Sequence, residues 1–429
     1  MNIHFKTFGC KVNQCETALM QSKVLGTGCN LSNPENADIV VINSCTVTAN
    51  ADRKTGQYLR KCLRANSKAK IFLTGCYVDR TENELKNKFS KTEQMFGKPP
   101  TDRTIEIEEK PNKCSDIQFF RNSEKENILK LLGFEPLHTS RRINPATTPL
   151  HTFNNHTRAY VKIQDGCDGK CSYCIVPKVR PELWSKNFND VISEVKNYVL
   201  AGHKEIVLCG IRLGKYKVRS PKSEVRSLVD LIKELEKIDG LYRIRLSSIE
   251  LHDISCDLIE LMSKSKKLCH HLHISLQSGD DTILRDMNRP YTADEFFNKI
   301  EKIRKKIPDI GITTDIIIGY PTDTDATLKN SYNFVKKCAF SRLHIFRFSR
   351  RPGTKADLIK RNCPEATIKK WQGKFTQLDM YLKKSFLKKF SGKKLEVLTE
   401  SDGYGYTSNY IYLKLPQKYP ENRMVIYEK

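Results

Sequence analysis

Short apolar runs recur along the first hundred residues, and each ends in a small polar residue or glycine followed by cysteine. The runs are HFKTFGC (4–10), IVVINSC (39–45) and KIFLTGC (70–76). A helix-like stretch over residues 52–64 lies between the last two runs. Strand and helix in alternation predict a parallel sheet with covering helices.

The cysteines that end these runs predict a binding site. Ligands bind just beyond the carboxyl ends of parallel strands, so we expect Cys10, Cys45 and Cys76 at one edge of the sheet. Their separations of 35 and 31 residues each correspond to one strand–helix–strand unit. The alternative is that they are three small buried core residues.

Strands and helices alternate again from residue 158 onwards. Six segments are expected as strands: AYVKIQ (159–164), EIVLC (205–209), YRIRLSS (242–248), LHISLQ (272–277), ITTDIIIG (312–319) and LHIFRFS (343–349). Residues 227–238 and 294–307 carry apolar residues at helical spacing. Six such units predict a partial or open relative of the TIM barrel, with functional residues at the carboxyl ends of the strands.

The end of the chain combines a long helix with short strands. Residues 367–390 form an amphipathic pattern whose apolar stripe is Ile368, Trp371, Phe375, Leu378, Leu382 and Phe386. Nine lysines and one acid, Asp379, lie between Thr367 and Leu395. The last 40 residues alternate like short strands and interleave lysine with tyrosine, as many RNA-binding surfaces do. The alternative is a solvated helix face and a small barrel with an aromatic core.

These patterns predict an α/β protein of three domains. An N-terminal parallel α/β domain is expected over residues 1–140, a central partial (β/α)6 barrel over 152–385 and a small C-terminal β-barrel over 386–429. Residues 143–157, rich in Pro, Thr and Asn, are expected to link the first two domains.

Charge and cysteine content indicate what kind of partner and what kind of chemistry to expect. The net charge of +25 favours a polyanionic partner, above all nucleic acid. Fifteen cysteines, an odd number without the spacing of a secreted disulfide framework, favour metal or redox chemistry. No apolar run approaches the roughly 20 residues of a membrane span, and the N-terminus does not resemble a signal peptide. We therefore expect a cytoplasmic protein without a membrane segment.

The stretch DGCDGKCSYCIVP (165–177) carries the strongest chemical signal. Cys167, Cys171 and Cys174 are spaced C-x3-C-x2-C and follow the first expected barrel strand. A closed zinc site or an electron-transfer iron–sulfur cluster has four protein ligands. Three thiolates on a cubane leave one iron open, where a substrate or cofactor can bind.

The sequence resembles the methylthiotransferases of the radical S-adenosylmethionine superfamily over nearly the whole chain. The resemblance is carried by TFGCKVNQCET (7–17), NSCTVTANADRK (43–54), RAYVKIQDGCDGKCSYCIVP (158–177), RIRLSSIE (243–250), HLHISLQSGDDTILRDMNRPYT (271–292), TTDIIIGYPTDT (313–324) and HIFRFSRRPGTKA (344–356). Residues from 391 onwards resemble the family's terminal TRAM domain, a small RNA-binding barrel. KVNQ and RLSSIE resemble most the branch that modifies N6-threonylcarbamoyladenosine in tRNA.

The resemblance implies two 4Fe–4S clusters, each held by three cysteines. Cys10, Cys45 and Cys76 would hold an auxiliary cluster, while Cys167, Cys171 and Cys174 would hold the radical cluster. S-adenosylmethionine would bind the open iron of the radical cluster and yield a 5′-deoxyadenosyl radical. The implied partners are tRNA and a reductant such as a flavodoxin or ferredoxin; the sulfur donor is not specified, and a monomer is expected.

Further site residues follow from position and from the resemblance, although no side chain is assigned to catalysis itself. Tyr173 is a candidate to stack on the adenine of S-adenosylmethionine. Other candidate contacts to this cofactor, at or beyond strand ends, are Ser247, Ser248, Glu250 and Gln277. The alternative for these is ordinary loop hydrogen bonding. Candidates to hold the threonylcarbamoyl carboxylate are Arg180, Arg347 and Arg350.

The segment after the third cysteine departs from the family pattern. The family follows its third cysteine with I-I-P-x-x-R-G-x-x-R-S-R, whereas this chain has IVPKVRPELWSK. Pro181 replaces the glycine, and Trp184 and Lys186 replace two arginines, so the loop must run differently.

Alternative functions are methylthiolation of isopentenyladenosine in tRNA or of a ribosomal protein aspartate, or tRNA binding with decayed activity.

Overall fold

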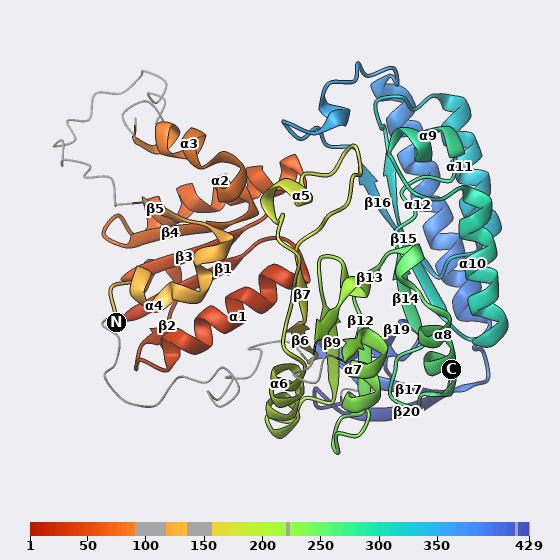
Figure 1. The fold of residues 1–429 in the computed structure, drawn as a ribbon, viewed down its shortest axis with the longest axis horizontal. Coiled ribbons are helices and arrows are strands. Elements are labelled where there is room, and N and C mark those ends of the chain that lie inside the picture. Colours follow the sequence, from red (N-terminus) through yellow and green to blue (C-terminus); the bar gives the residue numbers. More distant parts are fainter. Residues whose placement is uncertain (91–116, 135–156, 220–223, 417–418, 429) are drawn as a thin grey trace. The chain divides into compact units, whose positions relative to one another are not determined.

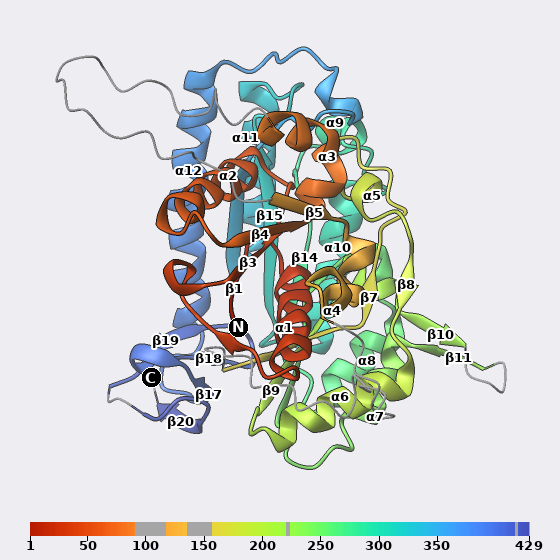
Figure 2. The same cartoon turned by 90° about the vertical axis from the view of Figure 1, so that its left-hand side faces the viewer.

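The computed structural model describes residues 1–90, 117–134, 157–219, 224–416 and 419–428. The chain forms two compact units, shown in Figures 1 and 2. Unit 1 comprises Met1–Ile143 and Lys178–Arg180, and unit 2 comprises Asn144–Pro177 and Pro181–Lys429. The expected linker over residues 143–157 lies, except for its last residue, outside the described residues.

Unit 1 is built on a five-stranded parallel sheet, as the sequence predicts. The strand order is β2-β1-β3-β4-β5, with β1 at Asn2–Thr7, β2 at Asn30–Leu31, β3 at Ile39–Ser44, β4 at Lys70–Gly75 and β5 at Ile117–Phe120. Its helices are α1 at Lys11–Leu25, α2 at Ala49–Ala65, α3 at Cys76–Ser90 and α4 at Ile128–Leu131.

The central strand β3 explains why the sheet has helices on both faces. All six of its residues are buried. Val40 and Ile42 pack in one apolar cluster with Leu59 of α2, while Val41 packs in another with Met20 of α1. Continuous apolar strands of this kind are typical of parallel sheets covered on both sides.

Unit 2 contains the six expected parallel strands and an additional two-residue strand, β13, in an open, barrel-like arrangement. Strands β6 (Ala159–Lys162), β9 (Glu205–Cys209) and β12 (Arg243–Leu246) form one group, and β13 (Ser248–Ile249), β14 (His271–Ile274), β15 (Gly311–Ile318) and β16 (Arg342–Arg347) form the other. A parallel bridge between Ile244 and Leu268 joins the groups at β12. All the pairs within both groups are parallel.

Helices connect these strands in the alternation that the apolar patterns predict. They are α6 at Phe188–Leu200, α7 at Leu228–Leu235, α8 at Cys256–Lys264, α9 at Asp281–Asp286, α10 at Ala293–Lys306 and α11 at Asp325–Cys338. Shorter elements complete the unit: α5 at Val176–Val179, β7 at Gln164–Asp165, β8 at Trp184–Ser185, β10 at Lys217–Arg219 and β11 at Val225–Ser227. Helices α10, α11 and α12 lie along β15 and β16 in Figures 1 and 2. No helix of the described residues is long and apolar enough to cross a membrane.

The C-terminal part consists of helix α12 (Glu365–Lys388) and a small sheet. The six residues of the expected apolar stripe of α12 are all buried, and the helix packs against β16 and α11. Strands β17 (Lys394–Thr399), β18 (Tyr404–Thr407), β19 (Tyr412–Lys414) and β20 (Met424–Glu428) form an antiparallel sheet of order β19-β18-β17-β20. Among the described residues β19 and β20 remain edges, so the expected closed barrel is not confirmed.

A buried charged cluster joins this small sheet to the amino ends of the barrel strands. Glu205, the first residue of β9, has no exposed surface and accepts a hydrogen bond of 2.7 Å from Arg245 Nε. Arg243 and Arg245 also donate to backbone carbonyls of the sheet, among them Tyr406 at 2.8 Å. Burial raises the pKa of Glu205, but the neighbouring arginines outweigh it and hold the pKa below its usual value. The small sheet is therefore part of the packing of unit 2.

Candidate functional site

The fold brings Cys10, Cys45 and Cys76, here called the auxiliary triad, to one edge of the unit 1 sheet. Cys45 and Cys76 directly follow β3 and β4, and Cys10 caps the start of α1 just after β1. These three strands are neighbours. Burial, with smaller contributions from the neighbouring Cys10 and Cys76, raises the pKa of Cys45 to about 12. The arrangement agrees with the prediction from strand-end position.

Two glycines allow the strand ends to approach this closely. Gly9 and Gly75 precede two of the triad cysteines and have φ angles of +108° and +103°. A Cβ on Gly9 would lie 2.4 Å from the Cβ of Cys45, and a Cβ on Gly75 would lie 2.2 Å from the Ser44 carbonyl oxygen. Each Gly-Cys pair therefore needs its glycine for both conformation and space.

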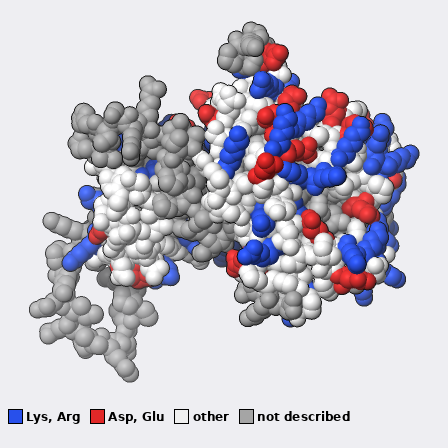
Figure 3. Space-filling model, turned by 90° about the horizontal axis from the view of Figure 1, so that it is seen from below, with Lys and Arg blue, Asp and Glu red and all other residues white. Residues whose placement is uncertain are grey.

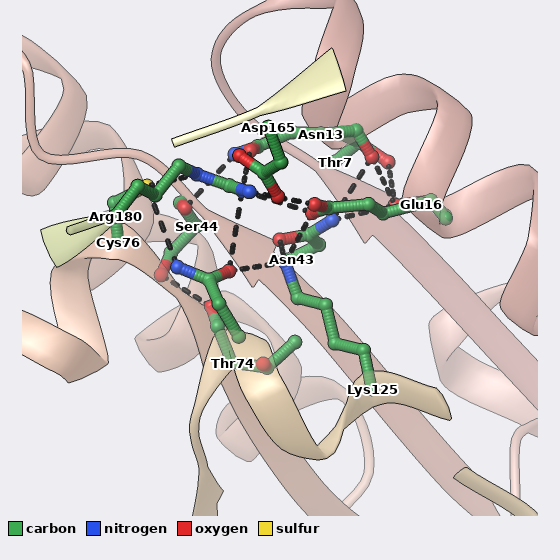
Figure 4. A network of polar contacts seen from close by, with 12 residues as sticks. Thr7, Asn13, Glu16, Asn43, Ser44, Thr74, Cys76, Lys125, Asp165 and Arg180 are labelled. Carbon is green, nitrogen blue, oxygen red and sulfur yellow. Dashed lines mark hydrogen bonds and ion pairs between the residues drawn. The ribbon is translucent and has the colours of Figure 1, made fainter. Parts of the chain in front are cut away.

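Arg180 lies at the auxiliary triad, because Lys178–Arg180 belong to unit 1. Its guanidinium makes two hydrogen bonds to the Glu16 carboxylate, at 2.8 and 3.0 Å, and its Nε donates to Cys76 Sγ at 3.3 Å. Lys125 Nζ is 2.5 Å from the same carboxylate. Figure 4 shows Arg180, Glu16 and Lys125 pointing toward one another. The candidate substrate-binding Arg180 is thus already paired in this structure.

Sequence reasoning found neither Glu16, which pairs with Arg180, nor Lys125, which pairs with the same carboxylate. Glu16 and Lys125 are 109 residues apart and are 8% and 5% exposed. Buried ionised side chains are rare unless paired. Glu16 stands six residues after Cys10 on α1, and its place on a buried helix face is the only signal the sequence offered.

Cys167, Cys171 and Cys174, here called the radical triad, follow β7 in unit 2 at the barrel face that the sequence predicts. Burial, with smaller contributions from the neighbouring Cys171 and Cys167, raises the pKa of Cys174 to about 12. The Gly169 backbone N–H donates to Cys167 Sγ at 3.3 Å. Gly166, at φ +80°, has no room for a Cβ, which would lie 1.8 Å from the Glu182 carbonyl oxygen.

Arg289 links the radical triad to Glu250, one of the candidate cofactor contacts. Its Nη1 donates to Cys171 Sγ at 3.3 Å, and its Nη2 makes an ion pair with the Glu250 carboxylate. Tyr291 accepts from Arg289 Nε at 2.9 Å and donates to the Ser275 carbonyl oxygen at 2.6 Å. Arg289 and Tyr291 were not found from the sequence, although both lie within the quoted motif over residues 271–292.

The other candidate cofactor contacts differ in their surroundings. Tyr173 packs against an apolar cluster that includes Ile283 and Met287. Ser247 is 7% exposed, and its buried hydroxyl has no hydrogen-bond partner among the described residues. Ser248 is exposed. Gln277, 9% exposed, lies three residues beyond the end of β14 and has a φ of +74°, a strained conformation that is common at functional sites.

Arg347 and Arg350 lie at and beyond the end of β16. The Arg347 side chain is 42% exposed and forms an ion pair with Glu365. The Arg350 side chain is 45% exposed and donates to the Ile359 carbonyl oxygen at 2.6 Å. Both are therefore more accessible than Arg180.

The two triads fit iron–sulfur clusters better than single metal ions. No three His, Cys, Asp or Glu side chains of the described residues lie close enough to hold one ion. A 4Fe–4S cluster makes a different demand, because each cysteine binds a separate iron. Three cysteines at a glycine-lined strand end fit that demand in each unit, and a cluster held by them would have one iron without a protein ligand.

Comparison with known families agrees with this division. The family model for the Radical SAM superfamily matches residues 161–335, and the model for Uncharacterized protein family UPF0004 matches residues 2–97. The solved structure of the radical S-adenosylmethionine methyltransferase TsrM from Kitasatospora setae matches with a TM-score of 0.52 and 11% identity, over 83% of this chain and 77% of that chain. At this identity the match shows the fold alone. Fold and site together define a radical S-adenosylmethionine enzyme.

Relatives with similar sequences identify the family within this class of enzyme. It is 35% identical to the threonylcarbamoyladenosine tRNA methylthiotransferase MtaB of Thermotoga maritima, over 93% of this chain and 86% of the relative. It is 33% identical to MtaB of Bacillus subtilis, over 95% and 89%. It is also 30% identical to a tRNA-2-methylthio-N(6)-dimethylallyladenosine synthase of Aquifex aeolicus, over 93% and 88%. The chain belongs to the radical S-adenosylmethionine tRNA methylthiotransferase family, whose cofactors are S-adenosylmethionine and 4Fe–4S clusters.

Proposed function

We propose that the protein methylthiolates C2 of N6-threonylcarbamoyladenosine next to the anticodon of tRNA. The observation that carries the proposal is the presence of two separate cysteine triads, each at the carboxyl end of a parallel sheet. The target is an aromatic C–H without an acidic proton or a leaving group, so acid–base chemistry cannot activate it and a radical is needed. Relatives named for this reaction cover most of the chain and support the choice of substrate.

The two triads have different proposed roles in the reaction. S-adenosylmethionine, when bound, supplies an adenosyl radical at the radical triad, and the auxiliary triad holds the cluster from which sulfur is delivered. The residues proposed to orient S-adenosylmethionine are Tyr173, Ser247, Ser248, Glu250 and Gln277. Among these, the partnerless Ser247 hydroxyl and the strained Gln277 are the strongest structural support.

The outer face of α12 is proposed as a tRNA-binding surface. Exposed lysines follow its length, namely Lys369, Lys370, Lys374, Lys383, Lys384, Lys388 and Lys389. Tyr381 and Met380, in the middle of this face, are 60% and 58% exposed. Asp379 is buried, accepts from the Leu343 backbone N–H at 2.8 Å and pairs with Lys383 at 2.5 Å. Asp325 pairs with Lys370 at 2.8 Å, so these two acids neutralise only part of the positive charge of this face. Such a face pairs phosphate-binding cations with an aromatic ring.

The small C-terminal sheet is proposed to act as a TRAM-like RNA-binding module. Tyr404 and Tyr412 stack with ring centroids 4.9 Å apart, and Tyr412 is 49% exposed. The proposal also includes a cytoplasmic monomer, reduced by a flavodoxin or ferredoxin. Since the small sheet shares buried arginines with the barrel, its role is better tested by point variants than by deletion.

Two matched pairs of lysines test the α12 surface. Replacing Lys384 and Lys388 with glutamine should weaken tRNA binding and flatten its salt dependence, by about 1.5 in the log–log slope for two lost phosphate contacts. The control replaces Lys302 and Lys305, which are exposed on α10. On the face shown in Figure 3, Lys and Arg are interspersed with Asp and Glu. The control is needed because exposed lysines elsewhere on the molecule can also bind tRNA through charge alone. Equal effects of both pairs would contradict a defined surface.

The threonylcarbamoyl carboxylate distinguishes this substrate from prenylated adenosine. An exposed arginine can hold it with two hydrogen bonds, whereas an apolar tail needs an apolar pocket. Arg347 and Arg350 are the accessible candidates. Arg180 would have to release Glu16 before it could bind a substrate.

The deciding experiment offers one anticodon stem-loop with threonylcarbamoyl-, isopentenyl- or unmodified adenosine to the reconstituted enzyme. We expect methylthiolation of the threonylcarbamoyl form, read by mass spectrometry of the nucleosides. Preference for the isopentenyl form would change the substrate and keep the reaction. Absence of product on every RNA, with S-adenosylmethionine cleavage intact, would favour the ribosomal protein aspartate; absence of cleavage as well would favour a tRNA-binding protein with decayed activity.

A further inference from the structure

The two cysteine triads share a contact that is not evident from their sequences. In each, an arginine donates a hydrogen bond of 3.3 Å to one cysteine sulfur: Arg180 to Cys76 and Arg289 to Cys171. Each arginine is in turn held by a glutamate, Glu16 in unit 1 and Glu250 in unit 2. The same pairing therefore recurs at two sites built from unrelated elements.

Arg180 is more tightly enclosed than a surface loop residue would be. The residue is 4% exposed. Besides Glu16 and Cys76, its Nη2 donates to the side-chain oxygens of Asn13 at 3.1 Å and Asn122 at 3.3 Å. Both amino groups and the Nε of the guanidinium are thereby directed to fixed acceptors. A guanidinium does not lose its proton in a protein, so this is a permanent positive charge.

Arg180 is also linked to a second cysteine of the auxiliary triad through a shared neighbour. Its Nη2 donates to Asn13 Oδ1 at 3.1 Å, and Cys10 Sγ lies 3.8 Å from the same oxygen. Two other charged groups face the same network. Lys125 shares the Glu16 carboxylate, and Asp79 bonds to Asn122 rather than to either cation.

We propose that Arg180 is a positioning residue of the auxiliary cluster, which it stabilises in its reduced form by a hydrogen bond to the Cys76 sulfur and by its fixed charge. The inference rests on the proposed iron–sulfur role of the auxiliary triad. Hydrogen bonds to cluster sulfurs and the net charge around them set the reduction potential. Glu16 fixes the guanidinium in place through two hydrogen bonds, at 2.8 and 3.0 Å.

The test measures the potential of each cluster separately in the full-length chain. Replacing the radical triad with alanine leaves the auxiliary cluster alone, and its potential is followed by an EPR redox titration. In that background, Arg180→Gln should shift the midpoint potential to more negative values, and Arg180→Lys should shift it less. In the reverse background, where the auxiliary triad is replaced, Arg180→Gln should leave the radical cluster unchanged, while Arg289→Gln should shift it.

A double variant separates tuning from a purely structural role. Arg180→Gln alone leaves Glu16 without one of its partners, whereas Arg180→Gln with Glu16→Gln removes both charges. If Arg180 acts on the cluster, the potential stays low in the double variant. If Arg180 only neutralises Glu16, the double variant regains the wild-type potential, and the proposal is overturned. An unchanged potential in both variants, with full iron, also overturns it.

The same series shows whether a failure lies with the cluster or with the arginine. If the chain with an intact auxiliary triad and replaced radical triad binds no iron, the iron–sulfur role of that triad is wrong. If it binds iron but the Arg180 substitutions leave its midpoint potential unchanged, the error is confined to the role of Arg180. The iron content of each variant, with thermal unfolding as the check on folding, distinguishes the two outcomes.

Discussion

The auxiliary and radical triads place the same three ligands at a strand end by opposite routes. The radical triad lies within residues 167–174, in one loop, and its geometry is largely local. The auxiliary triad is gathered from three neighbouring strands, and its second layer adds Lys125 and Arg180 from farther along the chain. The first site depends on a loop, whereas the second depends on the whole fold of unit 1.

Removal of either triad tests this division most severely. Replacing the three cysteines of the radical triad with alanine should halve the iron, from about eight to about four per chain, because each cubane holds four. It should also abolish cleavage of S-adenosylmethionine. Replacing the auxiliary triad should remove the same amount of iron but leave cleavage intact.

Iron analysis after anaerobic reconstitution and detection of 5′-deoxyadenosine measure the two outcomes. The matched control replaces three cysteines outside both triads, Cys29, Cys209 and Cys338, with serine one at a time. These are buried and are not expected to bind iron. Full iron in either triple-alanine variant would refute the assignment of that triad.

Backbone packing should matter more for the auxiliary triad, and glycine substitutions can show this. Gly75→Ala places a Cβ 2.2 Å from a backbone oxygen at φ +103°, so we expect a loss of about 3 kcal/mol or more in the free energy of unfolding. Auxiliary iron should be lost while cleavage of S-adenosylmethionine persists. Denaturant unfolding and iron content provide the measurements.

Gly28→Ala is the control for this substitution. Gly28 has a similar φ of +83° but no atom within 4 Å of the added Cβ. The conformational cost alone, about 1–2 kcal/mol, should remain, and both clusters should assemble. Equal iron loss in the two variants would mean that general destabilisation of unit 1, rather than the strand-end packing, controls the site.

The arginine that contacts the radical triad gives the next smaller effect. Arg289→Lys keeps the charge but removes the fork that joins Cys171 to Glu250. Loss of a residue that supports a metal ligand typically reduces activity about 10- to 100-fold, so we expect cleavage of S-adenosylmethionine to fall by that amount. The auxiliary potential should stay unchanged; if it shifts, the two sites are not independent.

The strands and the cysteine positions could be predicted because their causes are local. A run such as IVVINSC fixes a buried strand, and its end fixes the position of Cys45. All six barrel strands were expected within a few residues of their observed bounds for the same reason. The spacing of the radical triad is likewise contained in a single loop.

What the sequence did not predict depends on long-range pairing. Arg180 was expected to bind substrate, but a buried carboxylate on α1 is its partner in the structure. No periodicity connects residue 16 with residue 125 or 180. The C-terminal sheet was expected as a closed barrel, yet its edge strands are not paired in the described residues. Alternation predicts strands, but closure depends on register and twist, which alternation does not encode.

The smallest expected effect concerns Tyr173, the aromatic residue of the radical triad loop. If its ring stacks on the adenine of S-adenosylmethionine, Tyr173→Leu should cost about 1 kcal/mol, which is about a five-fold increase in KM for this cofactor. Tyr173→Phe is the control, because it keeps the ring and the packing against Ile283 and Met287. The KM for cleavage of S-adenosylmethionine, measured without RNA, reads the effect. A loss of kcat and iron in the leucine variant, with KM unchanged, would instead assign Tyr173 to the packing of the loop.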